Sequence, residues 1–74
     1  MAKDSEKMVD YMVMIVNEYA DFSGISQKEA FSRLLSCGGI DALEESYEIE
    51  HTLPVSSTLD ALNALYARSR AGLA

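Results

Sequence analysis

His51 is the only histidine of the chain, and a run of carboxylates closely precedes it. If a helix continues this far, Tyr47 lies one turn earlier on the same face. An imidazole beside carboxylates can serve as an acid, a base or a metal ligand, whereas a structural imidazole bonds a backbone group where a helix ends. The chain offers no second histidine and no glycine-rich anion loop to complete a site. Catalysis by His51 with Tyr47 and a nearby carboxylate is therefore the alternative hypothesis, and we predict no metal site and no cofactor.

Cys37 is the only cysteine, so the chain cannot form an internal disulfide. Without a cluster of cysteines and histidines, a structural zinc site is not predicted either. The residue falls near the expected end of a helix, where the helix dipole disfavours a thiolate. We therefore expect Cys37 to behave as a small buried hydrophobic residue.

Twelve acidic residues oppose six basic ones, which gives a net charge of −6. Binding to DNA or RNA depends largely on Lys and Arg, and anionic membrane surfaces attract the same residues. We therefore predict neither a nucleic-acid partner nor a membrane partner.

The segment 41–51 contains five acidic residues and neither Lys nor Arg. Such a run is either a solvated charged face or a surface that steers a basic protein partner toward the chain. The residues that we predict to contact a basic protein partner are Asp41, Glu44, Glu45, Glu48, Glu50 and His51.

The segment 6–22 has the periodicity of a helix with a wide apolar side. Its polar residues share about one third of the circumference, where Met14 is the one apolar residue among them. A helix that lies on a single neighbour needs a narrower apolar stripe, so this one is covered either by helices on several sides or by another chain. We predict a homodimer in which the helix self-associates through Met12, Val13 and Val16.

The whole pattern predicts an all-α fold, a compact bundle of four short helices at about 5–22, 27–37, 40–49 and 58–70. Capping residues set these boundaries: Gly24 after the first helix, Ser26 with Glu29 before the second, Asp41 with Glu44 in the third, and Ser57-Thr58 at the fourth. The second helix is expected to turn five residues inward: Ala30, Phe31, Leu34, Leu35 and Cys37.

A chain of 74 residues has room for one small domain, and we expect residues 1–74 to form it, with frayed ends at 1–4 and 71–74. The N-terminal segment lacks the basic region and long apolar run of an export signal. The apolar run Tyr11–Val16 is too short to span a bilayer. These features predict a cytoplasmic protein.

Three short motifs resemble a known family: Asn-Glu-Tyr-Ala at 17–20, Ile25-Ser26 followed by Phe31, and Tyr-Glu-Ile-Glu-His-Thr at 47–52. The chain resembles short bacterial proteins that are catalogued as a domain of unknown function, with a Tyr-Asp-x-Leu-His-Thr-like stretch. Glu50 stands where that pattern has Leu, and Asn17-Glu18 reverses its Glu-Asn order. The resemblance implies a small helical fold without an established activity. It also implies an accessory or antitoxin-like partner of a toxin-like or ADP-ribosyltransferase-like protein.

Together these patterns predict a protein-interaction module that self-associates. The alternative is a small enzyme or ligand-binding protein that uses His51 with Tyr47. A concave pocket lined by those groups would favour the alternative, and an exposed apolar surface would favour interaction.

Overall fold

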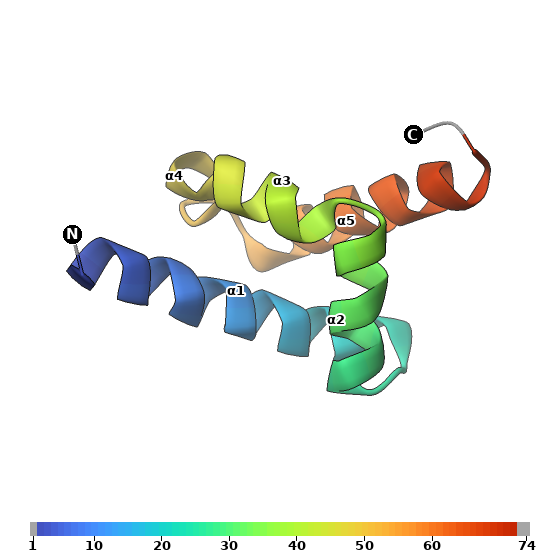
Figure 1. Ribbon diagram of the computed structural model, residues 1–74, viewed down its shortest axis with the longest axis horizontal. Helices are drawn as coiled ribbons and strands as arrows, with labels where there is room; N and C mark the ends of the chain where they lie inside the picture. The colour runs from blue at the N-terminus through green and yellow to red at the C-terminus, as the bar shows by residue number, and fades with distance from the viewer. Residues whose placement is uncertain (1, 73–74) are drawn as a thin grey trace.

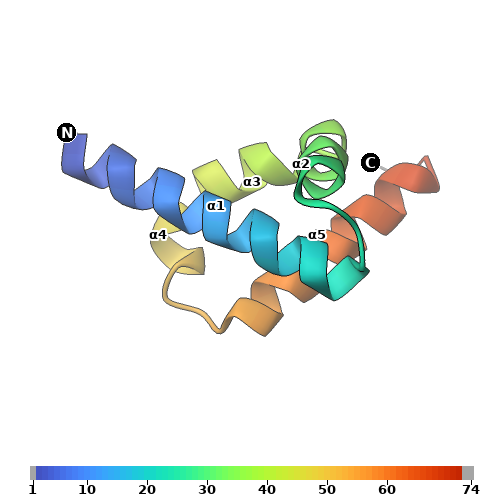
Figure 2. The ribbon, with the colours of Figure 1, turned by 90° about the horizontal axis from the view of Figure 1, so that it is seen from below.

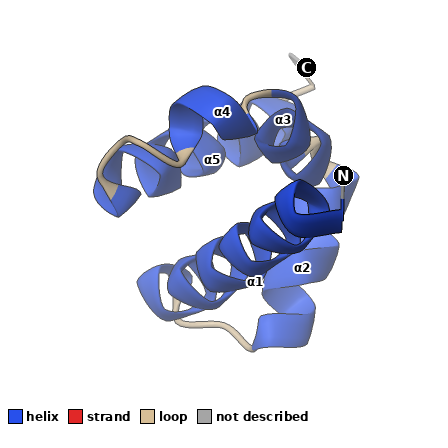
Figure 3. Ribbon diagram, turned by 90° about the vertical axis from the view of Figure 1, so that its left-hand side faces the viewer, coloured by secondary structure: helices blue, strands red, loops and turns tan. Residues whose placement is uncertain are grey.

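The computed structural model describes residues 2–72, with side chains from Glu6 onward, and every regular element in this range is a helix. The elements are α1 (Ala2–Ser23), α2 (Gln27–Ser36), α3 (Gly39–Glu45), α4 (Tyr47–Glu50) and α5 (Val55–Arg70). Helix α1 runs along one side of the molecule and α2 crosses it at one end, while α3, α4 and α5 lie on the other side (Figure 1, Figure 3). The predicted all-α fold is confirmed, with five helices in place of four.

The junction between α1 and α2 follows from its sequence. Gly24 adopts a left-handed φ of 69°, and the amides of Gly24 and Ile25 donate to the carbonyls of Asp21 and Ala20. These two bonds form the Schellman motif that closes a helix. Ser26 then caps α2, because its hydroxyl accepts a hydrogen bond from the Glu29 amide over 3.1 Å. Both predicted boundaries are confirmed.

The core lies where α1, α2, α3 and α5 meet. Its largest fully buried side chains are Tyr19 and Ile15 from α1, Leu34 from α2, and Thr58 from α5. Figure 2 shows α1 lying across the other elements, which it contacts through the side that carries Ile15 and Tyr19. Cys37 is buried and free, and its thiol donates to the Leu34 carbonyl.

The prediction of a single third helix at 40–49 is wrong, because the structure has two short helices there. Gly38 takes a φ of 82°, which only glycine adopts readily, and the chain turns there so that α3 begins at Gly39. Asp41 therefore lies inside the helix and does not cap it. A turn at Ser46 then separates α3 from the one-turn helix α4.

The last helix begins earlier than the predicted 58. Pro54 is its N-cap residue, and α5 starts at Val55, where the fixed φ of proline directs the chain into the helix. Ser57 and Thr58 thus lie within the first turns of α5, and no side chain caps it. The predicted capping signal at Ser57-Thr58 is therefore wrong, and Thr58, which is 1% exposed, bonds another helix.

Two further expectations need correction. Ala30, Leu34 and Cys37 are buried as predicted, but Phe31 is 47% exposed and Leu35 is 56% exposed. Helix α2 therefore packs against α1, α3 and α5 with a narrower face than its composition indicates.

The first helix, α1, begins before the predicted residue 5. Residues 2–4 belong to α1 and residues 71–72 form a turn, whereas the predictions for residue 1 and residues 73–74 lie outside the described residues. Within residues 2–72, no helix combines the length and the apolar character needed to cross a bilayer.

Candidate functional site

An aromatic row links α1 to the end of α4. The rings of Tyr11 and Tyr47 meet edge to face, with centroids 5.5 Å apart. Tyr47 in turn stacks on His51, with centroids 4.6 Å apart and an interplanar angle of 16°. The predicted pairing of Tyr47 with His51 on one face therefore exists, and Tyr11 joins it from the first helix.

His51 is exposed and bonds its own backbone. Its Nδ1 lies 2.7 Å from the Tyr47 carbonyl oxygen, which can only accept, so Nδ1 carries the proton. This bond and the stacking on Tyr47 fix the imidazole where α4 ends. Among the described residues, no group of three or more His, Cys, Asp or Glu side chains is placed to hold a metal ion.

Glu50 turns away from the other predicted partner residues. Its Oε2 accepts a hydrogen bond of 2.8 Å from the buried Thr58 hydroxyl, whose oxygen also lies 3.4 Å from the Tyr11 hydroxyl. The carboxylate therefore connects α4 to α5. Sequence reasoning missed this role because Thr58 was assigned to the capping pattern that begins at Ser57.

A groove of about 760 Å³ lies between the first turns of α1 and the α3–α4 segment. We call it the acidic groove, and its lining residues are Lys7, Met8, Glu44, Glu45, Ser46, Tyr47, Glu48, Ile49 and His51. Four of the six predicted partner residues thus share one surface, while Asp41 and Glu50 lie outside this lining. Ile49 is 68% exposed in the same groove and adds an apolar contact that the sequence pattern did not single out.

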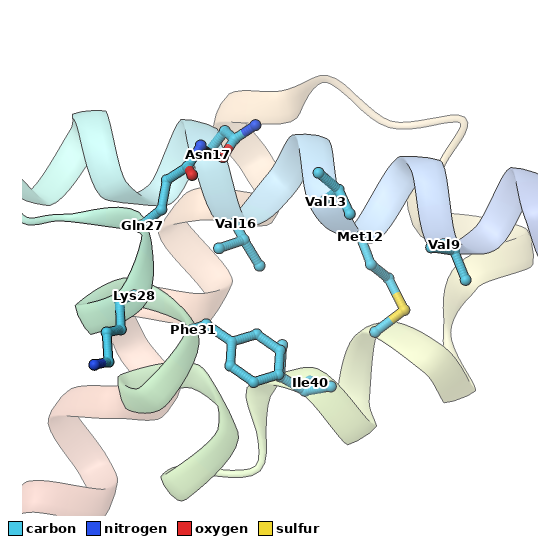
Figure 4. Close-up of a pocket in the computed structure, with 9 residues that line it drawn as sticks. All are labelled: Val9, Met12, Val13, Val16, Asn17, Gln27, Lys28, Phe31 and Ile40. Atoms are coloured by element: carbon cyan, nitrogen blue, oxygen red, sulfur yellow. Dashed lines mark hydrogen bonds between the residues drawn. The ribbon is translucent and has the colours of Figure 1, made fainter.

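A second groove, of about 530 Å³, is almost entirely apolar (Figure 4). We call it the α1 groove, and its lining residues are Val9, Met12, Val13, Val16, Asn17, Gln27, Lys28, Phe31 and Ile40. Met12 and Val16 point from α1 toward Phe31 and Ile40, which form the opposite wall. All three predicted self-association residues line this groove.

The edge of the α1 groove that α1 itself forms consists of exposed apolar side chains. Val9 is 57% exposed and Val13 is 54% exposed, whereas Met12 and Val16 are partly buried against the core. The wide apolar side of α1 is therefore covered only in part by α2, α3 and α5. Val9 and Phe31 were not predicted here, although Val9 lies one helical turn before Val13.

Polar groups mark one end of the α1 groove. The Gln27 side-chain amide donates to Asn17 Oδ1, which joins α2 to α1. Lys28 lines the same end, and its amino group points away from the apolar side chains (Figure 4). The groove thus has an apolar centre and polar residues at one end. Protein-binding surfaces commonly combine an apolar core with a polar rim in this way.

A basic cluster joins α2 to α5. The Arg33 guanidinium lies 4.3 Å from the Tyr66 ring centroid, and Arg70 approaches the same ring at 5.8 Å. The neighbouring Tyr19 hydroxyl raises the pKa of Arg33 above its usual value. No hydrogen bond of standard geometry joins the two groups, and the Tyr19 hydroxyl is buried without a partner among the described residues.

Comparison with known proteins gives one match. Residues 10–65, more than half of the chain, match a family described as a protein of unknown function (DUF3791). Neither the curated proteins nor the solved structures contain a match to the chain. The resemblance found in the sequence is thus confirmed, and the chain belongs to the DUF3791 family of proteins of unknown function.

Proposed function

We propose that the protein is a protein-interaction module that receives an apolar helix face in the α1 groove. The observation that carries this proposal is the exposure of Val9, Val13 and Phe31 around one concave apolar surface. Exposed apolar patches of this kind on small proteins mark interaction sites, because burying them removes apolar area from water. Grooves with such walls bind amphipathic helices through residues spaced by three and four positions.

The lining chemistry supports binding over catalysis. The residues around the α1 groove are apolar except for an amide pair and Lys28, so this lining contains neither a nucleophile nor an acid–base pair. The alternative function, an enzyme or ligand-binding protein, would use the acidic groove, where His51, Tyr47 and Glu48 line one surface. His51 holds Tyr47 through its backbone and ring, which supports a structural use of the imidazole.

The acidic groove is the second surface of the proposed module. Glu44, Glu45 and Glu48 lie around it together with the exposed Ile49, so it combines negative charge with an apolar contact. A basic protein segment with one apolar side chain would complement both features. A cytoplasmic accessory or antitoxin-like subunit in a bacterium is the role that these two surfaces and the family resemblance support.

The proposal is tested by affinity capture from the native host with three versions of the chain. Val13→Glu places a charge in the α1 groove, and Met14→Glu places the same charge on the polar side of α1, where Met14 is 37% exposed. We expect the wild type and Met14→Glu to retain the same partners, at defined stoichiometry, and Val13→Glu to lose them. Equal recovery by all three versions would contradict the proposal, as would a failure of every version to recover either a foreign protein or a second copy of the chain.

A further inference from the structure

We propose that the helix received by the α1 groove is α1 of a second copy of this chain, packed antiparallel about a two-fold axis near Met12 and Val13. This inference rests on the proposed function, because it names the partner of the same groove. It commits the module to a symmetric dimer, in which each copy supplies both a ridge and a hollow.

Charge favours this surface for contact between identical copies. Two chains with a net charge of −6 repel each other wherever their acidic residues face one another. The nine lining residues of the α1 groove include no carboxylate, and Lys28 is their one charged member. The acidic groove carries three glutamates against one lysine, Lys7, so two copies that packed there would bring together surfaces of the same net charge. The α1 groove is therefore where two copies meet with little repulsion.

The spacing of the exposed residues suits a helix pair. Val9, Val13 and Val16 recur at intervals of four and three positions, the spacing that lets two helices share an apolar seam. Val9 and Val13 project as a ridge beside a hollow whose far wall contains Phe31. A two-fold axis across this surface places the ridge of each copy in the hollow of the other.

The polar residues beside the apolar seam determine whether the second α1 helix packs parallel or antiparallel to the first. Asp10 and Asn17 lie within about 60° of Val13 on α1, both toward the exposed side. In a parallel two-fold pair, each flank of the seam faces the opposite flank of the second helix, so Asp10 and Asn17 of the two copies would lie on different sides of the seam. An antiparallel pair centred near Met12 and Val13 instead brings Asp10 beside Asn17 of the second copy. Since Asn17 Oδ1 already accepts from Gln27, its amide hydrogens are available to that carboxylate.

Association is measured first, by sedimentation of the full chain over about 1 to 300 µM. We expect a reversible dimer for the wild type and for Met14→Glu. Val13→Glu should raise the dimer dissociation constant by about tenfold or more, because it buries an unpaired charge at the seam. Val13 is half exposed within one chain, so the variant should keep its helical circular dichroism signal.

Disulfide trapping then tests the direction. Val9→Cys and Val16→Cys are introduced into differently tagged copies, and the wild type, whose Cys37 is buried, is the control. Under mild oxidation, the mixture of the two variants should form a cross-linked pair, and Val9→Cys alone should not. A wild type that stays monomeric throughout, or Val9→Cys that cross-links to itself, overturns the inference. A monomer that still captures a foreign partner through Val13 would leave the proposed function standing, so the two failures are distinguishable.

Discussion

The hydroxyl of Thr58 donates a hydrogen bond of 2.8 Å to Glu50 Oε2, and this one contact ties the end of α4 to the first turns of α5. Thr58 is 1% exposed, so its hydroxyl needs the partner that Glu50 supplies. The connector between the two helices is thereby held at both ends.

The first prediction is a double-mutant cycle on this pair. Thr58→Val should lower the free energy of unfolding by about 1–3 kcal/mol, because it removes the donor to a charged acceptor. Adding Glu50→Leu should restore most of that loss, since an apolar pair leaves no unsatisfied group. Urea denaturation of the wild type, the two single variants and the double variant measures the coupling. Additive losses would mean that the two side chains act independently.

The second prediction concerns close packing at Gly39. A Cβ on this residue would lie 3.1 Å from Leu34 Cδ2 and 3.2 Å from Leu62 Cδ2. Gly39→Ala should therefore destabilise the fold by about 1–3 kcal/mol through overpacking. Leu62→Val in the same chain should recover part of the loss, because it shortens one of the opposing side chains. Thermal unfolding of the four versions decides this, and a stabilising Gly39→Ala would contradict it.

The third prediction compares two tyrosine hydroxyls. The Tyr19 hydroxyl is buried without a hydrogen-bond partner in the part of the chain that the structure describes, so Tyr19→Phe should leave stability unchanged or raise it by up to about 1 kcal/mol. The Tyr11 hydroxyl lies 3.4 Å from Thr58 Oγ1, and Tyr11→Phe should lower stability by about 0.5–1 kcal/mol. Chemical denaturation of both variants gives the comparison. A clear loss in Tyr19→Phe would show that the contact with Arg33 stabilises the fold.

The fourth prediction separates a structural from a catalytic His51. His51→Ala removes one exposed backbone hydrogen bond and one stacked ring, so we expect a loss of at most about 1 kcal/mol. The same variant should still bind partners through the α1 groove, whose lining does not include His51. If His51→Ala folds normally but abolishes the biological effect of the chain, the enzyme alternative gains support over interaction.

The fifth prediction tests the acidic groove with a partner in hand. Glu45→Lys with Glu48→Lys should slow association and flatten its dependence on salt, because exposed charges act mainly on the association rate. Glu18→Lys with Asp21→Lys makes the same change of net charge on exposed positions of α1 outside the groove. Stopped-flow kinetics over a salt series compare the two pairs. If both double variants slow association equally, the slowing depends on net charge and not on the acidic groove.

The elements that depend on local chemistry were predictable from the sequence. The end of α1 at Gly24 and the start of α2 at Ser26 follow from residues that act on their own neighbours. The start of α5 follows from Pro54, but the capping pattern from Ser57 to Asp60 predicted a later start. The break at Ser46 was not predictable from local chemistry. The role of Thr58 was not predictable either, because its partner Glu50 lies eight positions away.

The candidate site was predictable in part for a similar reason. Helical periodicity placed Met12, Val13 and Val16 on one face, and the structure sets all three along the α1 groove. The same periodicity placed Phe31 among the buried residues of α2. Whether an apolar residue is covered depends on how far the neighbouring helices reach, which periodicity within a single helix does not specify.

The contacts of Tyr11 imply that the two halves of α1 pack at different stages of folding. The C-terminal half meets α2 through a turn of a few residues, so it can dock as soon as α2 has been synthesised. The N-terminal half is held through Tyr11 by Tyr47 and by Thr58, which lies 47 positions further along the chain. Closing so long a loop makes this contact a late event in folding, after most of the chain has left the ribosome. The segment that carries Val9 and Val13 is thus the last part of α1 to be fixed in place.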